Sequence, residues 1–82
     1  MRKQNITIHG STGTIGKNAL SVIAKSSNQY KVFALSAKSK IKTLYNQIKK
    51  FTPKYAVVLS KEKARSLSYL CANDNISTKI LF

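Results

Sequence analysis

The sequence predicts an α/β fold with a parallel sheet, built as one small unit of 82 residues. Three observations predict it. Short apolar stretches alternate along the chain with longer amphipathic ones, which is the pattern of βα units. A glycine-rich turn joins the first apolar stretch to the first amphipathic one. Finally, no linker or low-complexity segment divides the chain.

The first unit lies at the amino terminus. Apolar and polar residues alternate over Asn5–His9, which predicts a strand. Gly10, Gly13 and Gly16 follow within seven residues, and apolar residues then recur at helical spacing from Thr14 to about Lys25. We therefore expect a strand, a glycine turn and a helix.

Two further units follow in the same order. Lys31–Ser36 is a short apolar run suited to a strand covered on both faces. Apolar residues at steps of three and four then predict a helix over residues 41–51, which Pro53 ends. Tyr55–Leu59 is another candidate strand, and Ser60 is a candidate cap for the helix after it.

A fourth strand is expected over Lys79–Phe82. Three βα units and a fourth strand make a partial Rossmann-like sheet, because strands joined by helical crossovers run parallel. We expect the first strand to lie in the middle of the first three. Ligands of such sheets bind beyond the carboxyl ends of the strands, which is where the glycines fall.

The charge is strongly one-sided, with 15 lysines and arginines against two acidic residues and a formal net charge of +13. Such an excess is typical of nucleic-acid-binding proteins. Nearly all the bases are lysines scattered over every segment, which favours solvated faces. Charge alone leaves both interpretations open.

Targeting signals are weak. No apolar run approaches the roughly 18 residues of a membrane span, and the apolar stretch that a signal peptide needs ends at His9. A single cysteine, Cys71, cannot form an internal disulfide. We expect a cytoplasmic protein without a membrane partner.

The glycine turn predicts a phosphate-binding site. Its spacing is G-x-x-G-x-x-G, without the lysine placement of a P-loop. Glycines let a phosphate approach the backbone, and the helix that follows offers free N–H groups to a diphosphate. Ser11, Thr12 and Thr14 add hydroxyl groups. The alternative is a tight turn with no ligand.

The end of the second strand bears on cofactor choice. Proteins that bind NAD usually place an acidic residue there to hold the ribose hydroxyls. This chain has Lys38, Ser39 and Lys40 instead, which would accept the 2′-phosphate of NADP. The alternative is a solvated basic loop.

The stretches ITIHGSTGTIGKNALSVI, YKVFALSA and FTPKYAVV together resemble the amino-terminal part of the 1-deoxy-D-xylulose 5-phosphate reductoisomerase family. The resemblance covers nearly the whole chain and implies that Thr12, Gly13, Thr14 and Ile15 contact the cofactor. The family's second cofactor stretch, typically G-K-N, falls on Lys38, Ser39 and Lys40. Here lysine replaces the glycine, and the family's lysine is displaced by one position.

The resemblance also implies an enzyme that uses NADPH and a divalent metal, Mg or Mn, to make 2-C-methyl-D-erythritol 4-phosphate for isoprenoid synthesis. The family enzyme is a homodimer and acts on a sugar phosphate. It is several times longer, so residues 1–82 would be an incomplete NADPH-binding domain, with the catalytic and carboxyl-terminal domains absent. Glu62 and Asp74 match no family metal ligand, so we assign no catalytic or metal-binding residue and expect this chain alone to be inactive. The alternative is a small basic nucleic-acid-binding protein, which only the charge favours.

Overall fold

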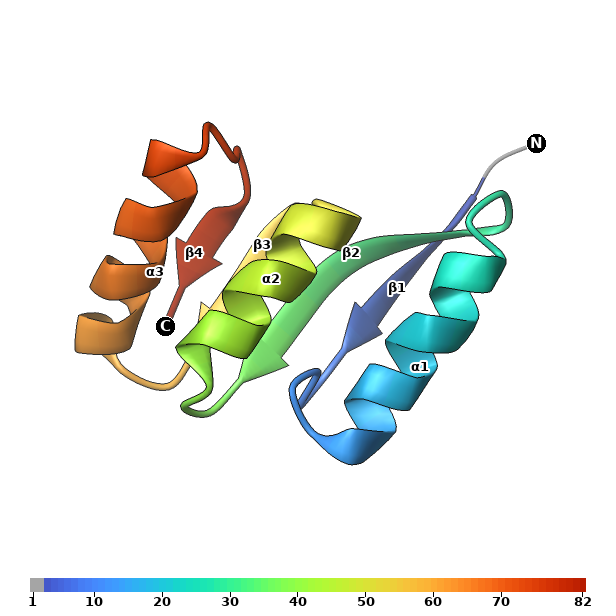
Figure 1. Cartoon of the computed structure of the whole chain (residues 1–82), viewed down its shortest axis with the longest axis horizontal. Coiled ribbons are helices and arrows are strands. Elements are labelled where there is room, and N and C mark those ends of the chain that lie inside the picture. The colour runs from blue at the N-terminus through green and yellow to red at the C-terminus, as the bar shows by residue number, and fades with distance from the viewer. Residues whose placement is uncertain (1–2) are drawn as a thin grey trace.

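The structure, a computed structural model, describes residues 3–82. Strands and helices alternate along the chain as the sequence predicts (Figure 1). The elements are β1 (Gln4–Ile8), α1 (Thr14–Lys25), β2 (Tyr30–Ala37), α2 (Ile41–Phe51), β3 (Tyr55–Val58), α3 (Lys61–Asn73) and β4 (Lys79–Leu81). The chain is a partial Rossmann-like α/β fold.

The four strands form one parallel sheet in the order β1-β2-β3-β4. The parallel pairing is confirmed, but the prediction that the first strand lies in the middle of the first three is wrong, because β2 lies between β1 and β3. Each crossover moves the chain by one strand in the same direction. The apolar pattern that predicts a strand is local and says nothing about its neighbours.

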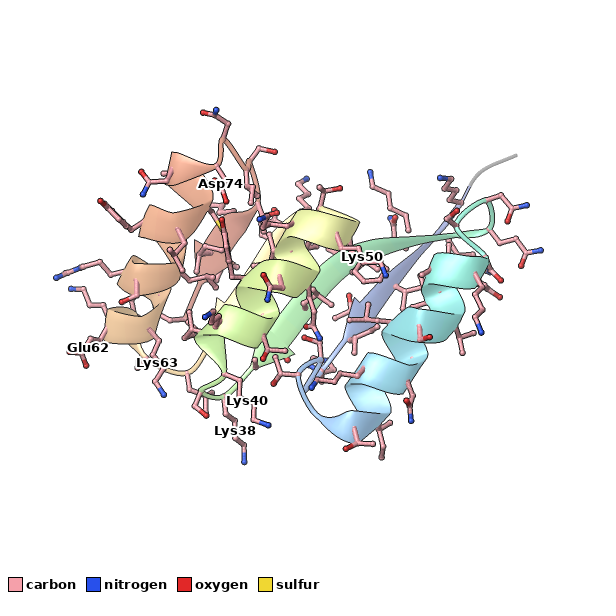
Figure 2. The ribbon with its side chains drawn as sticks, in the orientation of Figure 1. Lys38, Lys40, Lys50, Glu62, Lys63 and Asp74 are labelled. Atoms are coloured by element: carbon pink, nitrogen blue, oxygen red, sulfur yellow. The ribbon has the colours of Figure 1, made fainter. Side chains whose placement is uncertain are left out.

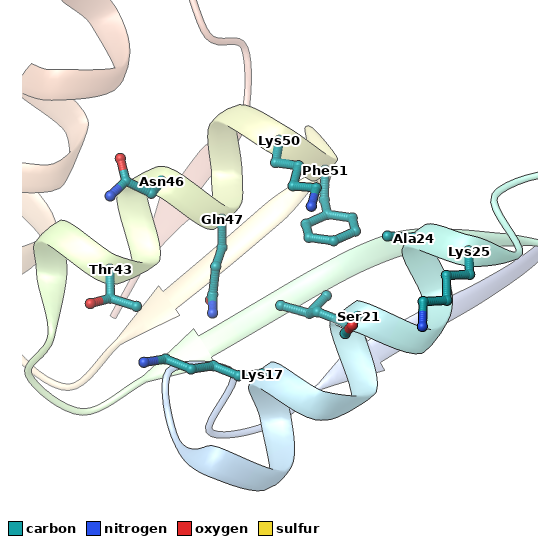
Figure 3. A pocket seen from close by; sticks show the side chains of 10 residues that line it. Lys17, Ser21, Ala24, Lys25, Thr43, Asn46, Gln47, Lys50 and Phe51 are labelled. Atoms are coloured by element: carbon teal, nitrogen blue, oxygen red, sulfur yellow. The ribbon is translucent and has the colours of Figure 1, made fainter.

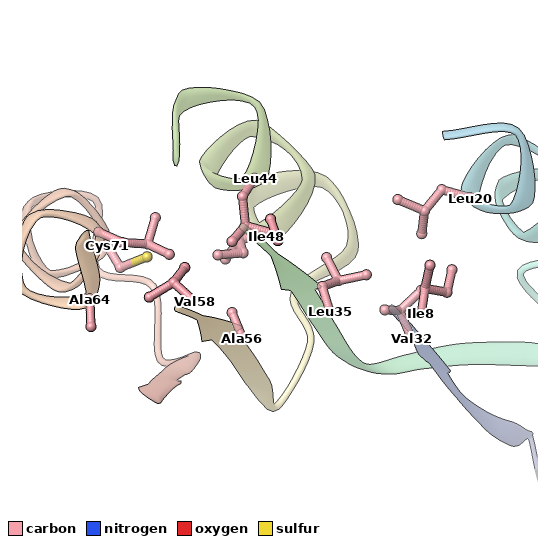
Figure 4. Close-up of a cluster of buried hydrophobic side chains, with 12 residues drawn as sticks. Ile8, Leu20, Val32, Leu35, Leu44, Ile48, Ala56, Val58, Ala64 and Cys71 are labelled. Atoms are coloured by element: carbon pink, nitrogen blue, oxygen red, sulfur yellow. The ribbon is translucent and has the colours of Figure 1, made fainter. Parts of the chain in front are cut away.

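All three helices cover one face of the sheet, and the core lies between the two layers (Figure 4). A right-handed crossover repeated in one direction places successive helices on the same face. The fully buried apolar side chains come from both layers: Leu35 and Val58 from the sheet, and Leu44, Ile48 and Leu67 from α2 and α3.

The other face of the sheet is covered by no element of residues 3–82. Side chains alternate across a strand, so Tyr55 and Val57 point away from the core in which Ala56 is buried. Tyr55 packs edge-on against Phe33, with ring centroids 5.5 Å apart. This face therefore carries half-buried apolar and aromatic side chains.

The element boundaries follow local signals in the sequence. Ser60 caps α3 as predicted, with its Oγ accepting a hydrogen bond from the Lys63 N–H at 3.1 Å. Thr52 takes a left-handed conformation at the end of α2, and buried Pro53 follows it. None of the helices in residues 3–82 is long and apolar enough to cross a membrane.

Candidate functional site

The candidate site begins at the glycine turn, residues 9–13, which joins β1 to α1. Gly10 has a φ of +64°, a conformation that residues with a side chain rarely adopt. Its carbonyl accepts a hydrogen bond from the Gly13 N–H at 3.1 Å. The chain thereby reverses within a few residues beyond the carboxyl end of β1.

Helix α1 starts without a side-chain cap. Gly13 is the N-cap residue, in an extended conformation, and no side chain accepts a hydrogen bond from the first turn. The first N–H groups of an α-helix have no acceptor within the helix, and they carry the positive end of its dipole. Because Gly13 has no Cβ, a ligand can approach these groups closely. The start of α1 thus has the chemistry of an anion site.

A second loop lies beside the glycine turn. The basic loop, residues 38–40, joins β2 to α2, and Figure 2 shows Lys38 and Lys40 projecting from it into solvent. The two loops are adjacent because β1 and β2 are neighbours and both loops follow carboxyl ends of strands. Between them lies a groove of about 300 Å³, lined by Gly10, Thr12, Gly13, Lys38, Ser39 and Lys40. We call it the cofactor groove because the sequence predicts cofactor contacts for most of these residues.

The structure brings the sequence-predicted site residues together around α1's first turn. Thr12 and Gly13 share the cofactor groove with the whole basic loop. Thr14 and Ile15 line a neighbouring hollow of about 480 Å³, to which Gly13 also contributes. Thr12 is only 7% exposed, whereas Ile15 is 86% exposed. Ile15 therefore offers a ligand far more surface than Thr12 does.

Hydrogen bonds from β2 and α2 hold the glycine turn in place, and the sequence did not predict them. Ser36, near the end of β2, accepts hydrogen bonds from the Ser11 N–H (to its carbonyl, 2.9 Å) and from the Gly10 N–H (to its Oγ, 3.2 Å). Gln47 of α2 makes two more hydrogen bonds to Ser11. The only sign of these hydrogen bonds in the sequence was a glutamine three residues after Leu44, near the apolar face of the predicted helix.

The two acidic side chains and Cys71 take no part in this site. Glu62 is exposed on the first turn of α3, and Asp74 pairs with Lys49 across 3.9 Å. Within residues 3–82, no three His, Cys, Asp or Glu side chains cluster where they could hold a metal ion. His9 is exposed. Cys71 is buried in the core, and this burial raises the pKa of its thiol.

Comparisons with known proteins identify relatives of this chain. The family model for 1-deoxy-D-xylulose 5-phosphate reductoisomerase matches residues 6–82. The reductoisomerase of Clostridium botulinum (strain 657 / Type Ba4) is 41% identical over 78 residues, which are 95% of this chain and 20% of the relative. That of Janthinobacterium sp. (strain Marseille) is 43% identical over 77 residues, covering 94% of this chain and 20% of the relative.

Solved structures of the same enzyme share the fold. The Zymomonas mobilis reductoisomerase in complex with NADPH superposes with a TM-score of 0.89 at 28% identity, over 98% of this chain and 21% of that one. A reductoisomerase in complex with NADPH, fosmidomycin and magnesium superposes with a TM-score of 0.89 at 29% identity, over 95% of this chain and 19% of that one. The chain thus spans about a fifth of the length of these relatives. It belongs to the 1-deoxy-D-xylulose 5-phosphate reductoisomerase family and corresponds to its amino-terminal portion.

Proposed function

We propose that this chain is the NADPH-binding portion of a 1-deoxy-D-xylulose 5-phosphate reductoisomerase, and that it holds the cofactor between the glycine turn and the basic loop. The observation that carries the proposal is the cofactor groove, which the uncapped start of α1 and two lysines border together. Solved relatives that share the fold are complexes with NADPH.

The start of α1 is the proposed site of the cofactor's diphosphate. The N–H groups of the first turn donate to its oxygens, and the Thr14 hydroxyl adds a donor beside them. Gly13 leaves room for this approach. The exposed Ile15 side chain packs against the apolar part of the bound cofactor.

The basic loop is the proposed site of the 2′-phosphate. Lys38 and Lys40 supply positive charge, and the Ser39 hydroxyl supplies a hydrogen-bond donor. No acidic side chain lines this groove, so a 2′-phosphate meets no like charge there. This arrangement favours NADPH over NADH.

The family reaction needs groups beyond this groove. NADPH supplies the hydride that reduces the sugar phosphate, and three solved relatives carry magnesium. The two carboxylate side chains of this chain lie on or beside α3, and Asp74 is paired with a lysine. The residues described here thus fit the cofactor but make no metal site. We therefore propose that the 82-residue chain binds cofactor and does not catalyse the reaction.

A fluorescence titration of the chain with NADPH tests the proposal, with NADH and random duplex DNA as competing ligands. We expect saturable NADPH binding that is tighter than NADH binding and is lost in Gly13→Val. DNA binding at low salt should disappear as the salt concentration rises, because only scattered charge supports it. Salt-resistant DNA binding with no NADPH binding would instead favour the nucleic-acid function.

A further inference from the structure

We propose that Gln47 is a positioning residue for the cofactor groove, because its side chain fixes the glycine turn against the helix that follows the basic loop. This inference rests on the proposed NADPH site. Gln47 lies on α2, and Figure 3 shows its side chain pointing from that helix toward the first turn of α1.

The contact consists of two hydrogen bonds between Gln47 and Ser11. The Ser11 Oγ donates to Gln47 Oε1 at 2.8 Å, and Gln47 Nε2 donates to the Ser11 carbonyl at 2.7 Å. Exchanging the two amide atoms would place Oε1 against a carbonyl oxygen, which cannot donate, so only one orientation of the amide fits. The pair therefore fixes both the side chain and the backbone of Ser11.

Burial makes the loss of either hydrogen bond costly. Ser11 is 0% exposed, so water does not replace a partner that is lost. Its N–H donates to the Ser36 carbonyl at 2.9 Å. The N–H, hydroxyl and carbonyl of Ser11 are thus held by β2 on one side and α2 on the other. The turn has little freedom to move while Gln47 is in place.

The position of Ser11 decides the shape of the groove. Its two neighbours in the chain, Gly10 and Thr12, both line the cofactor groove, and so does Lys40, the N-cap residue of α2. Gln47 therefore links the glycine turn to the helix that follows the basic loop. A ligand that spans both loops binds best when the distance between the glycine turn and the basic loop is fixed in advance. A ligand that touches only one loop does not depend on that distance.

The test compares Gln47→Leu with Asn46→Leu, two amide-to-leucine changes at adjacent positions of α2. Asn46 is exposed and makes no hydrogen bond to the glycine turn, so its variant is a matched control. We expect Gln47→Leu to weaken NADPH binding roughly tenfold, as the loss of a buried hydrogen bond does. Binding of adenosine 2′-monophosphate, which has no diphosphate, should change by less than about twofold in the same variant.

Three results would overturn the inference: unchanged NADPH affinity in Gln47→Leu, an equal loss in Asn46→Leu, or an equal loss for both ligands, which general destabilisation would produce. If Gln47→Leu does not fold, Ser11→Ala removes only the hydroxyl partner and allows the same comparison. If the unchanged protein binds no NADPH, the proposed function fails. The positioning role is then decided by hydrogen exchange at the Ser11 amide, which must be faster in Gln47→Leu than in Asn46→Leu.

Discussion

Gly16 lies so close to Ser11 that a Cβ on Gly16 would sit 2.6 Å from the Ser11 Cα. Helix α1 therefore starts in direct contact with the backbone of the glycine turn. A Cβ on Gly13, in contrast, would meet only the Gly10 carbonyl oxygen, at an ordinary 3.5 Å. Gly10 is needed for its positive φ, Gly16 for this close contact, and Gly13 for neither.

This difference predicts the stabilities of two alanine variants. Gly16→Ala forces the turn and the helix apart and should lower the free energy of unfolding by about 1–3 kcal/mol, although alanine is the better helix former. Gly13→Ala should lower it by less, about 0.5 kcal/mol, because alanine fits the space and is only a poorer N-cap residue than glycine. Urea unfolding followed by circular dichroism measures both, and equal stabilities would contradict the close contact at Gly16.

Gly13→Val should abolish NADPH binding while helical content stays nearly intact. A Cβ at this position fits the fold, but the branched side chain lies in the path of the diphosphate to the start of α1. Fluorescence titration measures the binding, and circular dichroism on the same sample checks the fold. NADPH affinity equal to that of the unchanged protein would mean that the turn has no ligand.

Removing the charge of the basic loop should reduce the preference for NADPH over NADH. Replacing Lys38 and Lys40 together by alanine should weaken NADPH binding about fivefold, because exposed charges contribute modestly, and should leave NADH binding unchanged. The matched control replaces Lys61 and Lys63 of α3 by alanine, which removes the same charge away from the groove. Equal effects in the two double variants would indicate that only net charge matters.

The 82-residue chain should show no reductoisomerase activity. Its two carboxylate side chains do not form a metal site in residues 3–82, and holding the sugar phosphate against the nicotinamide requires further groups. The assay supplies NADPH, magnesium or manganese, and 1-deoxy-D-xylulose 5-phosphate, and follows NADPH absorbance. Substrate-dependent oxidation that scales with protein concentration and vanishes in Gly13→Val would refute this prediction.

Stability should fall at alkaline pH because of Cys71. Burial raises the pKa of its thiol above the ordinary 9.0, so above that pH the unfolded chain releases a proton that the folded chain still holds. Proton release thus favours unfolding. The free energy of unfolding therefore falls as the pH rises from 9.0 until the folded thiol itself ionises. Urea unfolding over a pH series should show a shallower alkaline decline in Cys71→Ala. Parallel curves would show that other groups cause the decline.

The elements could be predicted closely from the sequence because their signals are local. The helix over residues 41–51 agrees with α2 at both ends, since its apolar spacing and Pro53 act within a few residues. The Ser60 cap likewise needs only its own backbone neighbours. The position of Thr12 and Gly13 beside the basic loop also followed from the sequence, because loops after parallel strands lie at one edge of the sheet.

The strand order and the Gln47 contact could not be predicted in this way. Both depend on contacts between segments far apart in the chain: β1 pairs only with β2 in residues 3–82, and Gln47 meets Ser11 across 36 positions. A glutamine on an amphipathic helix has the same local pattern whether it faces solvent or another loop. The sequence marks such a residue as polar without naming its partner.

The strand order also has a consequence for how the chain folds. Every strand pairs with the next strand in the sequence, so each pairing closes a loop that contains a single helix. Short closures cost little chain entropy, and a sheet of this kind can grow one strand at a time as the chain leaves the ribosome. Both walls of the cofactor groove, and the Gln47 side chain behind them, lie within the first 47 residues. All the residues that form the groove therefore leave the ribosome before β3 and β4 do.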